Sequence, residues 1–138
     1  MVVLSRVLTA SSSTRRQLID LTRQVEAFVQ ESGVANGLCT VSAPHATAGI
    51  IANENERGLL RDMLAKIEDL FPKSSAYEHN AIDDNGDAHL AAAFLGHSRA
   101  FPVINRRLVR GAWQNVFLVE LDGPRSRREI YLQIIGER

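Results

Sequence analysis

Residues 113–135, WQNVFLVELDGPRSRREIYLQII, contain two strand-like runs on either side of a turn, and this stretch decides the fold. The first run, Trp113–Leu121, is apolar on successive residues, a pattern typical of a strand that is buried on both faces. The turn is Asp122-Gly123-Pro124-Arg125, and the second run is Arg128–Ile135. We therefore expect two strands here that are free to pair antiparallel with their neighbours.

Further strand-like segments lie outside this stretch. Their ranges are Met1–Leu8, Arg15–Asp20, Gly37–Ala43, Ala48–Ala52 and Arg99–Ile104. Strands outnumber helices, and neighbouring strands can pair antiparallel. No repeat, linker or low-complexity segment divides the 138 residues. The sequence therefore predicts one α+β domain, residues 1–138, built on antiparallel sheet.

Three segments have the spacing or the end signals of helices. Their expected ranges are Asp20 or Thr22 to about Glu31, Asn53 to about Leu70, and Ala88–Leu95, with Gly33 and Gly96 ending the first and third. Asn53 and Glu56 resemble a capping box at the start of the second helix. That helix is expected to bury Leu60, Met63, Leu64, Ile67 and Leu70. Residues 71–87 lack clear periodicity, and a loop of that length usually carries function or stays mobile.

Composition limits the classes of function. The 16 basic and 16 acidic residues give a formal net charge of +0, so no overall field favours nucleic acid or an anionic membrane. No apolar run approaches the roughly 20 residues of a membrane span, and no signal peptide is recognised, so a cytoplasmic location is expected. The lone Cys39 excludes an intramolecular disulfide and a cysteine zinc cage, and we expect it to be a small buried strand residue.

Three histidines carry the strongest chemical signal. His45 connects two strands, whereas His79 and His89 flank a segment rich in aspartate. Imidazole is the commonest side-chain metal ligand, and it transfers protons near neutral pH. Because unpaired buried charges are costly, this polar segment lies either on solvent or in a site. One hypothesis is a metal site of His45, His79 and His89 with open positions for water or phosphate oxygens; the other is a solvated loop, and His97 is expected on the surface.

Short motifs follow one another in a fixed order from about Leu18 to Gly136, nearly the whole chain. They are His45-Ala46-Thr47-Ala48-Gly49-Ile50, Asn53-Glu54, Pro72 with Tyr77 and His79, Asp84-Asn85, Ala88-His89-Leu90, Leu95-Gly96, Pro102-Val103, Gly111-Ala112-Trp113-Gln114, Glu120, and Gly123-Pro124-Arg125 with Arg127. Together they resemble the YjbQ-type family, also called secondary thiamine-phosphate synthases. Ala46 and Ala112 depart from the family pattern, which usually has Thr at both positions, so hydrogen bonds from hydroxyl groups there are lost.

The resemblance implies an antiparallel β-sandwich, jelly-roll-like, with flanking helices and a homotrimeric assembly. It also implies weak thiamine-phosphate synthase activity, which joins aminopyrimidine methyl diphosphate to thiazole phosphate and releases diphosphate. A fold match does not fix the reaction. Two alternatives therefore stay open: a metal-dependent hydrolase of a small phosphorylated substrate, and a non-catalytic trimeric protein that binds a metal or ligand.

The expected site lies at a subunit boundary and takes a small phosphorylated substrate. His45 and Glu54 are expected to act in catalysis, as acid, base or ligand orienter. A divalent ion, Zn²⁺ or Mg²⁺, and Arg125 would neutralise the charge that develops on the diphosphate. The substrate-binding residues are expected to be Thr47, Asn53, Asp84, Asn85, Trp113, Gln114, Glu120 and Arg125.

Several of these residues also fit a purely structural role. Asn53 fits a helix cap, Trp113 fits the core or a subunit interface, and the hydroxyl of Thr47 is placed to orient His45. Glu120 lies within an apolar run, so its carboxylate must reach a partner, either an arginine or a site histidine.

Overall fold

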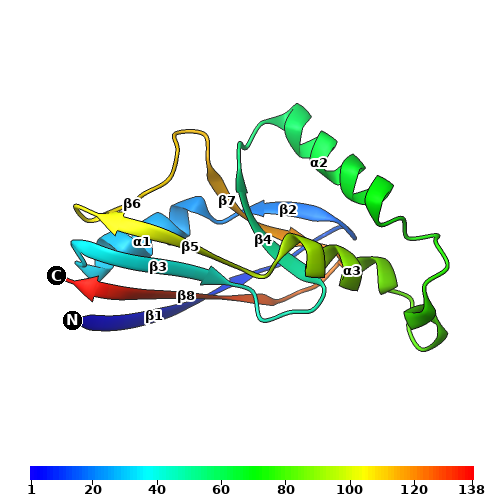
Figure 1. Ribbon diagram of the computed structural model, residues 1–138, viewed down its shortest axis with the longest axis horizontal. Helices are drawn as coiled ribbons and strands as arrows, with labels where there is room; N and C mark the ends of the chain where they lie inside the picture. Colours follow the sequence, from blue (N-terminus) through cyan, green and yellow to red (C-terminus); the bar gives the residue numbers. More distant parts are fainter.

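Two antiparallel sheets and three α-helices make up the protein, and the computed structural model describes all of residues 1–138 (Figure 1). The larger sheet has the strand order β1-β8-β3-β5-β6, and the smaller sheet has the order β2-β7-β4. The strands are β1 (Val2–Ala10), β2 (Gln17–Asp20), β3 (Asn36–Ser42), β4 (Ala48–Asn53), β5 (Ser98–Ile104), β6 (Arg107–Leu108), β7 (Asn115–Glu120) and β8 (Arg128–Glu137). The helices are α1 (Thr22–Ser32), α2 (Arg57–Leu70) and α3 (Gly86–Leu95), with a short 3₁₀ helix η1 (Glu78–Ala81). The expected α+β class is confirmed.

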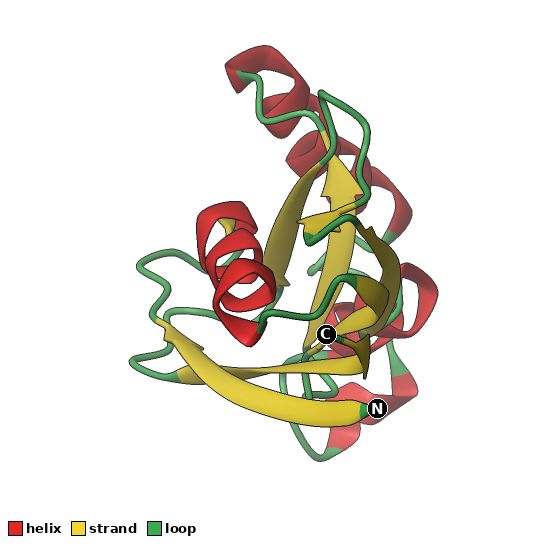
Figure 2. Cartoon of the chain, turned by 90° about the vertical axis from the view of Figure 1, so that its left-hand side faces the viewer, coloured by secondary structure: helices red, strands yellow, loops and turns green.

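Strand β7 is the centre of the smaller sheet, and both of its faces are buried. Val116 and Leu118 belong to the core that the two sheets share with α1 (Figure 2). Val119 packs on the opposite face together with residues of α2 and α3. Each fully buried side chain of this size contributes roughly 1.5–3 kcal/mol. Burial on both faces, expected from the run Trp113–Leu121, is therefore confirmed, and the covering elements come from the same chain.

Strand β8 has one buried and one exposed face. Ile130, Leu132 and Ile134 are fully buried, whereas Tyr131 and Gln133 between them are exposed. This alternation is typical of an antiparallel sheet with one face on the core and one on solvent. The face of β8 that points inward therefore lies opposite β7 in the shared core.

Helices α1 and α3 lie close to the ranges that the sequence predicts. The expected cap at Asp20 or Thr22 is wrong, because Leu21 occupies the N-cap of α1 without a side-chain capping bond; Asp20, one residue earlier, accepts the backbone N–H of Thr22 at 2.9 Å. Gly33 ends α1 in the left-handed conformation with φ of 71°, as its lack of a Cβ allows. The third helix begins at Gly86, two residues before the expected start.

Cys39 is buried in β3, as expected, and burial raises the pKa of its thiol to about 11. No helix has the length and hydropathy that crossing a membrane requires.

The expected start of α2 is wrong. The capping residue is Glu56, whose carboxylate accepts hydrogen bonds from the backbone N–H groups of Gly58 and Leu59. Asn53 instead ends β4, and its side chain accepts the N–H of Glu54 at 2.8 Å. Because Glu56 directly precedes the first helical residue, its longer side chain can fold back onto the helix N-terminus and replace the expected Asn cap.

The expected burial of α2 is also mostly wrong. Of the five apolar residues expected inside, only Ile67 is buried, and Leu70 is 63% exposed. The reason is visible in the arrangement: α2 projects from the body of the protein and touches it only in part (Figure 1). Leu60, Met63 and Leu64 are half-buried.

A buried ion pair joins the end of β7 to the start of β8. Glu120 is 0% exposed and Arg128 is 4% exposed. The Nε of Arg128 donates to Oε1 of Glu120 at 3.0 Å, and Ser12 Oγ donates to the same oxygen at 2.7 Å. The other oxygen accepts the backbone N–H groups of Leu121 and Asp122 at 3.1 Å each. Of the two partners considered for Glu120, the arginine is confirmed.

These contacts control the ionisation of Glu120. Burial of the carboxyl acts to raise its pKa, but hydrogen bonds from Arg128, Ser12 and the Asp122 N–H outweigh burial, so the pKa lies below its ordinary value of 4.5. A pKa that is lower in the folded than in the unfolded state stabilises the fold above the unfolded value. That stabilisation is lost as the pH falls through the folded value.

We expect the substitution Arg128→Met to lower the free energy of unfolding by roughly 3–5 kcal/mol at neutral pH, because it leaves Glu120 buried without a counter-ion. Urea unfolding of the variant and the parent protein measures the difference. The control is Arg127→Met, since Arg127 is 67% exposed and pairs loosely with Glu129 at 3.5 Å; its effect should stay below about 1 kcal/mol. The loss in Arg128→Met should shrink as the pH falls from 4.5, the ordinary pKa of the carboxyl, through the lower pKa of Glu120 in the folded parent protein. Equal losses in the two variants would contradict the pairing argument.

Candidate functional site

A cavity of about 330 Å³ opens between the β3–β4 connection and helix α3. Its lining includes the three imidazoles of His45, His89 and His97, together with small alanine side chains. His45 comes from the β3–β4 connection, His89 from α3, and His97 from the link between α3 and β5. The structure thus brings His45 and His89 to one place. It adds His97, which is exposed as expected but lines the same cavity.

His79 stands next to this histidine cavity. Its ring centroid lies 4.6 Å from that of His89, with an angle of 64° between the ring planes. The Nε2 of His79 is 3.2 Å from Oδ1 of Asn85. Because that oxygen can only accept, Nε2 of His79 carries the proton in this contact.

The imidazole of His45 is oriented by the backbone of β8. Its Nε2 lies 2.9 Å from the carbonyl oxygen of Glu129. A carbonyl oxygen only accepts hydrogen bonds, so Nε2 is the protonated nitrogen and Nδ1 of the neutral ring is left to accept a proton. The hydroxyl of Thr47 does not orient this ring: it accepts a hydrogen bond from Arg128 at 3.0 Å. The reason is that Nη2 of the buried Arg128 donates to this hydroxyl, so the hydroxyl is directed at the guanidinium and not at the imidazole.

Asp122 links the histidines to Arg125. Its carboxylate accepts hydrogen bonds from Asn85 Nδ2 at 2.8 Å, from Arg15 Nη1 at 3.0 Å and from Arg125 Nη2 at 3.0 Å. Burial acts to raise the pKa of Asp122, but Asn85, Arg125 and Arg15 outweigh burial and hold the pKa below its ordinary value. A hydrogen-bonded chain therefore runs from His79 through Asn85 and Asp122 to Arg125. Asp122 was expected only as a turn residue, and the available signal was its place directly before the Gly-Pro-Arg motif.

The remaining carboxylates of the aspartate-rich segment divide into buried and exposed groups. Asp87 is fully buried and accepts hydrogen bonds from Arg15 at 2.9 Å and Arg16 at 2.8 Å. Buried charge of this kind is stable because it is paired. Asp84 is exposed, and its backbone carbonyl accepts from Lys73 at 3.2 Å. Asp87 therefore serves the fold, whereas the carboxylate of Asp84 remains open to solvent.

Four of the expected site residues lie away from the histidine cavity. Asn53 and Glu54 follow β4, and Trp113 and Gln114 precede β7, whose first residue pairs with Asn53. None of the four lines the histidine cavity. They gather at the opposite end of the β4–β7 pair from His45, where β4 ends and β7 begins. Trp113 is 72% exposed, so a place in the core is wrong for this side chain, because β7 starts two residues later.

The three histidines expected as metal ligands do not form a complete ligand set within one chain. His79 and His89 are in contact, and His45 shares the cavity with His89. No group of three or more His, Cys, Asp or Glu side chains is close enough together to hold a metal ion. Binding of Zn²⁺ or Mg²⁺ stays a prediction, and the acid/base chemistry of the imidazoles does not depend on it.

Relatives with similar sequences are found in archaea and bacteria. Residues 6–137 match the family described as UPF0047 protein YjbQ-like. A UPF0047 protein of Methanothermobacter thermautotrophicus is 44% identical over 137 residues, which cover 99% of this chain and 95% of that protein. The UPF0047 protein YugU of Bacillus subtilis is 36% identical over 132 residues, which cover 95% and 98% of the two chains.

Solved structures agree with the sequence relatives. The crystal structure of a YbjQ-like protein of unknown function from Sulfolobus solfataricus is similar with a TM-score of 0.97 and 51% identity, and the match covers 98% of both chains. A hypothetical protein from Aeropyrum pernix gives a TM-score of 0.94 at 37% identity, covering 97% of this chain and 99% of that one. The chain belongs to the UPF0047 family of YjbQ-like proteins, a family of unknown function.

Proposed function

We propose that the protein is a transferase of the thiamine-phosphate synthase type. It would join aminopyrimidine methyl diphosphate to thiazole phosphate and release diphosphate. The observation that supports the proposal is the meeting of three imidazoles at one cavity, beside a hydrogen-bonded chain that leads from His79 to Arg125. The substrate class comes from the motif resemblance, and the side chains offer the proton donors and the cation that this chemistry requires.

The reaction needs stabilisation of a leaving group and little else. The bond that breaks joins the methylene carbon of the pyrimidine to a diphosphate oxygen, and its electron pair departs with the diphosphate. The lone pair of the thiazole nitrogen then forms the new C–N bond and yields a thiazolium. No electron donor or acceptor is required. Catalysis therefore rests on groups that neutralise the negative charge growing on the diphosphate.

His45 is well placed to assist the departing diphosphate. Since Nε2 is held by Glu129, the nitrogen Nδ1 is the one that reaches a substrate. An imidazole is protonated in part near neutral pH and can donate that proton to a phosphate oxygen. His89 and His97 line the same cavity and add further donors.

Arg125 supplies a cation that is already oriented. Its Nε donates to the carbonyl oxygen of Asp122, and its Nη2 donates to the carboxylate, both at 3.0 Å. The side chain is still 46% exposed, and Nη1 remains for a phosphate oxygen. Guanidinium groups fixed by a carboxylate in this way lose little entropy when they bind phosphate.

Hydrolysis of a small phosphorylated substrate is the second candidate. The specific observation in its favour is the free Nδ1 of His45, which in the neutral ring accepts a proton from water. General bases of this kind contribute typically about 10²–10⁴-fold to a rate. The two candidates use the same cavity and differ in whether the acceptor is a thiazole nitrogen or water.

A homotrimer with its site at the subunit boundary is part of the proposal. Strands β4 and β7 have six residues each, so their two ends are roughly 17 Å apart. His45 lies at one end, whereas Glu54 and Trp113 lie at the other. A single chain therefore presents the family motifs on two separate surfaces, and a neighbouring copy can supply the missing half. The exposed Trp113 is suited to such a contact.

We expect light scattering at micromolar concentration to give three times the chain mass of 15.3 kDa. The substitution Trp113→Ala should weaken the assembly, because it removes a large exposed aromatic side chain at the proposed boundary. Leu70→Ala on the projecting helix α2 serves as the matched control, since Leu70 is also a largely exposed apolar residue. A stable particle of 15.3 kDa would remove the trimer from the proposal.

We expect His45→Asn to lower the turnover of the two thiamine precursors by a factor on the order of 100 or more. Asparagine keeps a polar side chain of similar reach but cannot donate a proton at neutral pH. The melting temperature should change little, since the nearby core comes from residues such as Val41 and Ile50 rather than from the imidazole. The comparison variant is His97→Asn, which lies at the same cavity outside the family motifs and should have a smaller effect.

Three results would contradict parts of this assignment. Full activity of His45→Asn would make the imidazole a structural group. Hydrolysis of phosphoesters by the parent protein, without coupling of the two precursors, would favour the hydrolase. Absence of turnover on both substrate sets would favour a non-catalytic binding protein.

A further inference from the structure

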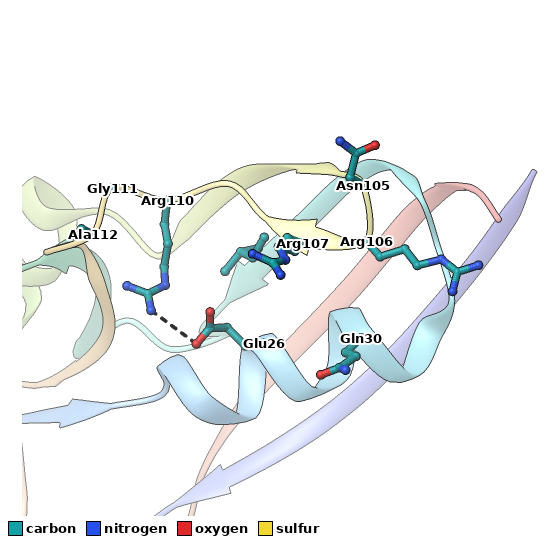
Figure 3. A pocket seen from close by; sticks show the side chains of 9 residues that line it. Glu26, Gln30, Asn105, Arg106, Arg107, Arg110, Gly111 and Ala112 are labelled. Atoms are coloured by element: carbon teal, nitrogen blue, oxygen red, sulfur yellow. Dashed lines mark hydrogen bonds and ion pairs between the residues drawn. The ribbon is translucent and has the colours of Figure 1, made fainter.

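A second cavity, of about 670 Å³, lies between helix α1 and the β5–β6 hairpin (Figure 3). It is well separated from the histidine cavity. Strand β5 runs between the two places, with His97 before its first residue and Asn105 after its last. Seven strand residues span roughly 20 Å. Neither the histidines nor Arg125 contributes to this second cavity.

The lining of this cavity is strongly basic. Arg106, Arg107 and Arg110 contribute three positive charges, whereas Glu26 is the one acidic residue. Figure 3 shows that the side chains of Arg107 and Arg110 lie over α1, while Arg106 extends away from the turn. The balance of charge over α1 is therefore positive in a protein whose net charge is +0.

Arg110 is held in place but not fully paired. Its Nη1 donates to the carbonyl oxygen of Gln114 at 2.8 Å, and its Nη2 reaches Glu26 only at 3.4 Å. The Nε group is buried and has no hydrogen-bond partner. The Nε groups of Arg15 and Arg16, outside this cavity, are also buried without a partner, so the positive charge of the lining, rather than this group, indicates an anionic ligand. Arg107, unlike Arg110, makes no ion pair, so its whole guanidinium is free.

The turn that carries the arginines has an unusual conformation. Asn105 and Arg106 form a two-residue turn between paired residues Ile104 and Arg107, and both have positive φ, 52° and 67°. Such turns favour glycine at the second position, because left-handed backbone is unfavourable for residues with a Cβ. Residues held in this region are frequent at ligand sites. The turn fixes the position of Arg107, the next residue, above α1.

We propose that this cavity binds a small phosphorylated molecule through two or more negative charges on adjacent phosphate groups. Guanidinium groups pair with phosphate oxygens in a planar, bidentate geometry, and Arg107 and Arg110 offer two of them. The buried Leu108 and the small Ala112 leave room beside them for an organic group. A volume of 670 Å³ falls within the range of small-ligand pockets, about 300–1,000 Å³. The site is separate from the histidine cavity and does not depend on the transferase assignment.

Titration calorimetry with inorganic diphosphate tests the proposal. We expect one diphosphate to bind in the cavity between α1 and the β5–β6 hairpin. Arg107→Ala should weaken this binding by about tenfold or more, as loss of a charge-assisted hydrogen bond does. Glu26→Gln should strengthen binding, because it removes the carboxylate that competes for Arg110. The matched control is Arg61→Ala, since Arg61 is an exposed arginine on α2 outside both cavities. Both test residues are exposed, so neither change threatens the fold.

Each of four results would overturn the proposal. These are absence of diphosphate binding, binding to the His45→Asn variant that survives a further Arg107→Ala change, equal weakening by Arg61→Ala, and equally tight binding of citrate, which would remove the preference for phosphate. The variant His45→Asn separates this site from the transferase. Diphosphate binding that is lost in His45→Asn and kept in Arg107→Ala would place the anion at the histidine cavity instead.

Discussion

The ion pair between Glu120 and Arg128 is the constraint on which the functional end of the molecule depends. Strand β7 is covered on both faces, so a carboxylate at its last position has no route to water and must be paired inside the core. The pair has five hydrogen bonds to Glu120 from Arg128, Ser12 and the following backbone. Arg128 also holds both the hydroxyl and the carbonyl of Thr47. One buried charge pair thus ties three chain segments together: the segment of Ser12, the β3–β4 connection that carries His45, and the turn after β7 that carries Asp122.

The arrangement explains how a site can be rigid although it is built from loops. His45 is two residues before Thr47, and Asp122 is two residues after Glu120. The ion pair holds Thr47 and Glu120, so it also limits where His45 and Asp122 can lie. Ser12 extends the same network to Arg125, whose backbone N–H donates to the Ser12 hydroxyl at 2.8 Å. Pre-organisation of this kind places proton donors and a cation before a substrate arrives. The positions of His45, Asp122 and Arg125 therefore depend on a few buried polar contacts.

The strands could be predicted from sequence because their signals are local. The alternation in β8 predicts one buried face, and the continuous apolar run of β7 predicts two. A carboxylate inside such a run, here Glu120, also predicts a buried partner for it. The face of α2 could not be predicted, because helical spacing of Leu60 and Leu64 does not tell whether anything packs against them. Asp122 was missed for a different reason: its partner Arg15 lies 107 residues away in sequence. The unpaired Nε of Arg110 likewise depends on contacts that no local pattern contains.

The pairing of β1 with β8 has a consequence for the way in which the chain reaches its structure. Val2 lies opposite Gly136, and Ala10 lies opposite Arg128, so the first strand has no partner in the sheet until almost the entire chain is present. During synthesis this strand leaves the ribosome long before β8 does and must wait for it. Closing so long a loop before any contact rewards it makes folding slow. Until β8 has been made, both edges of β1 lack a partner, and β8 then covers one of them while the other stays at the edge of the sheet.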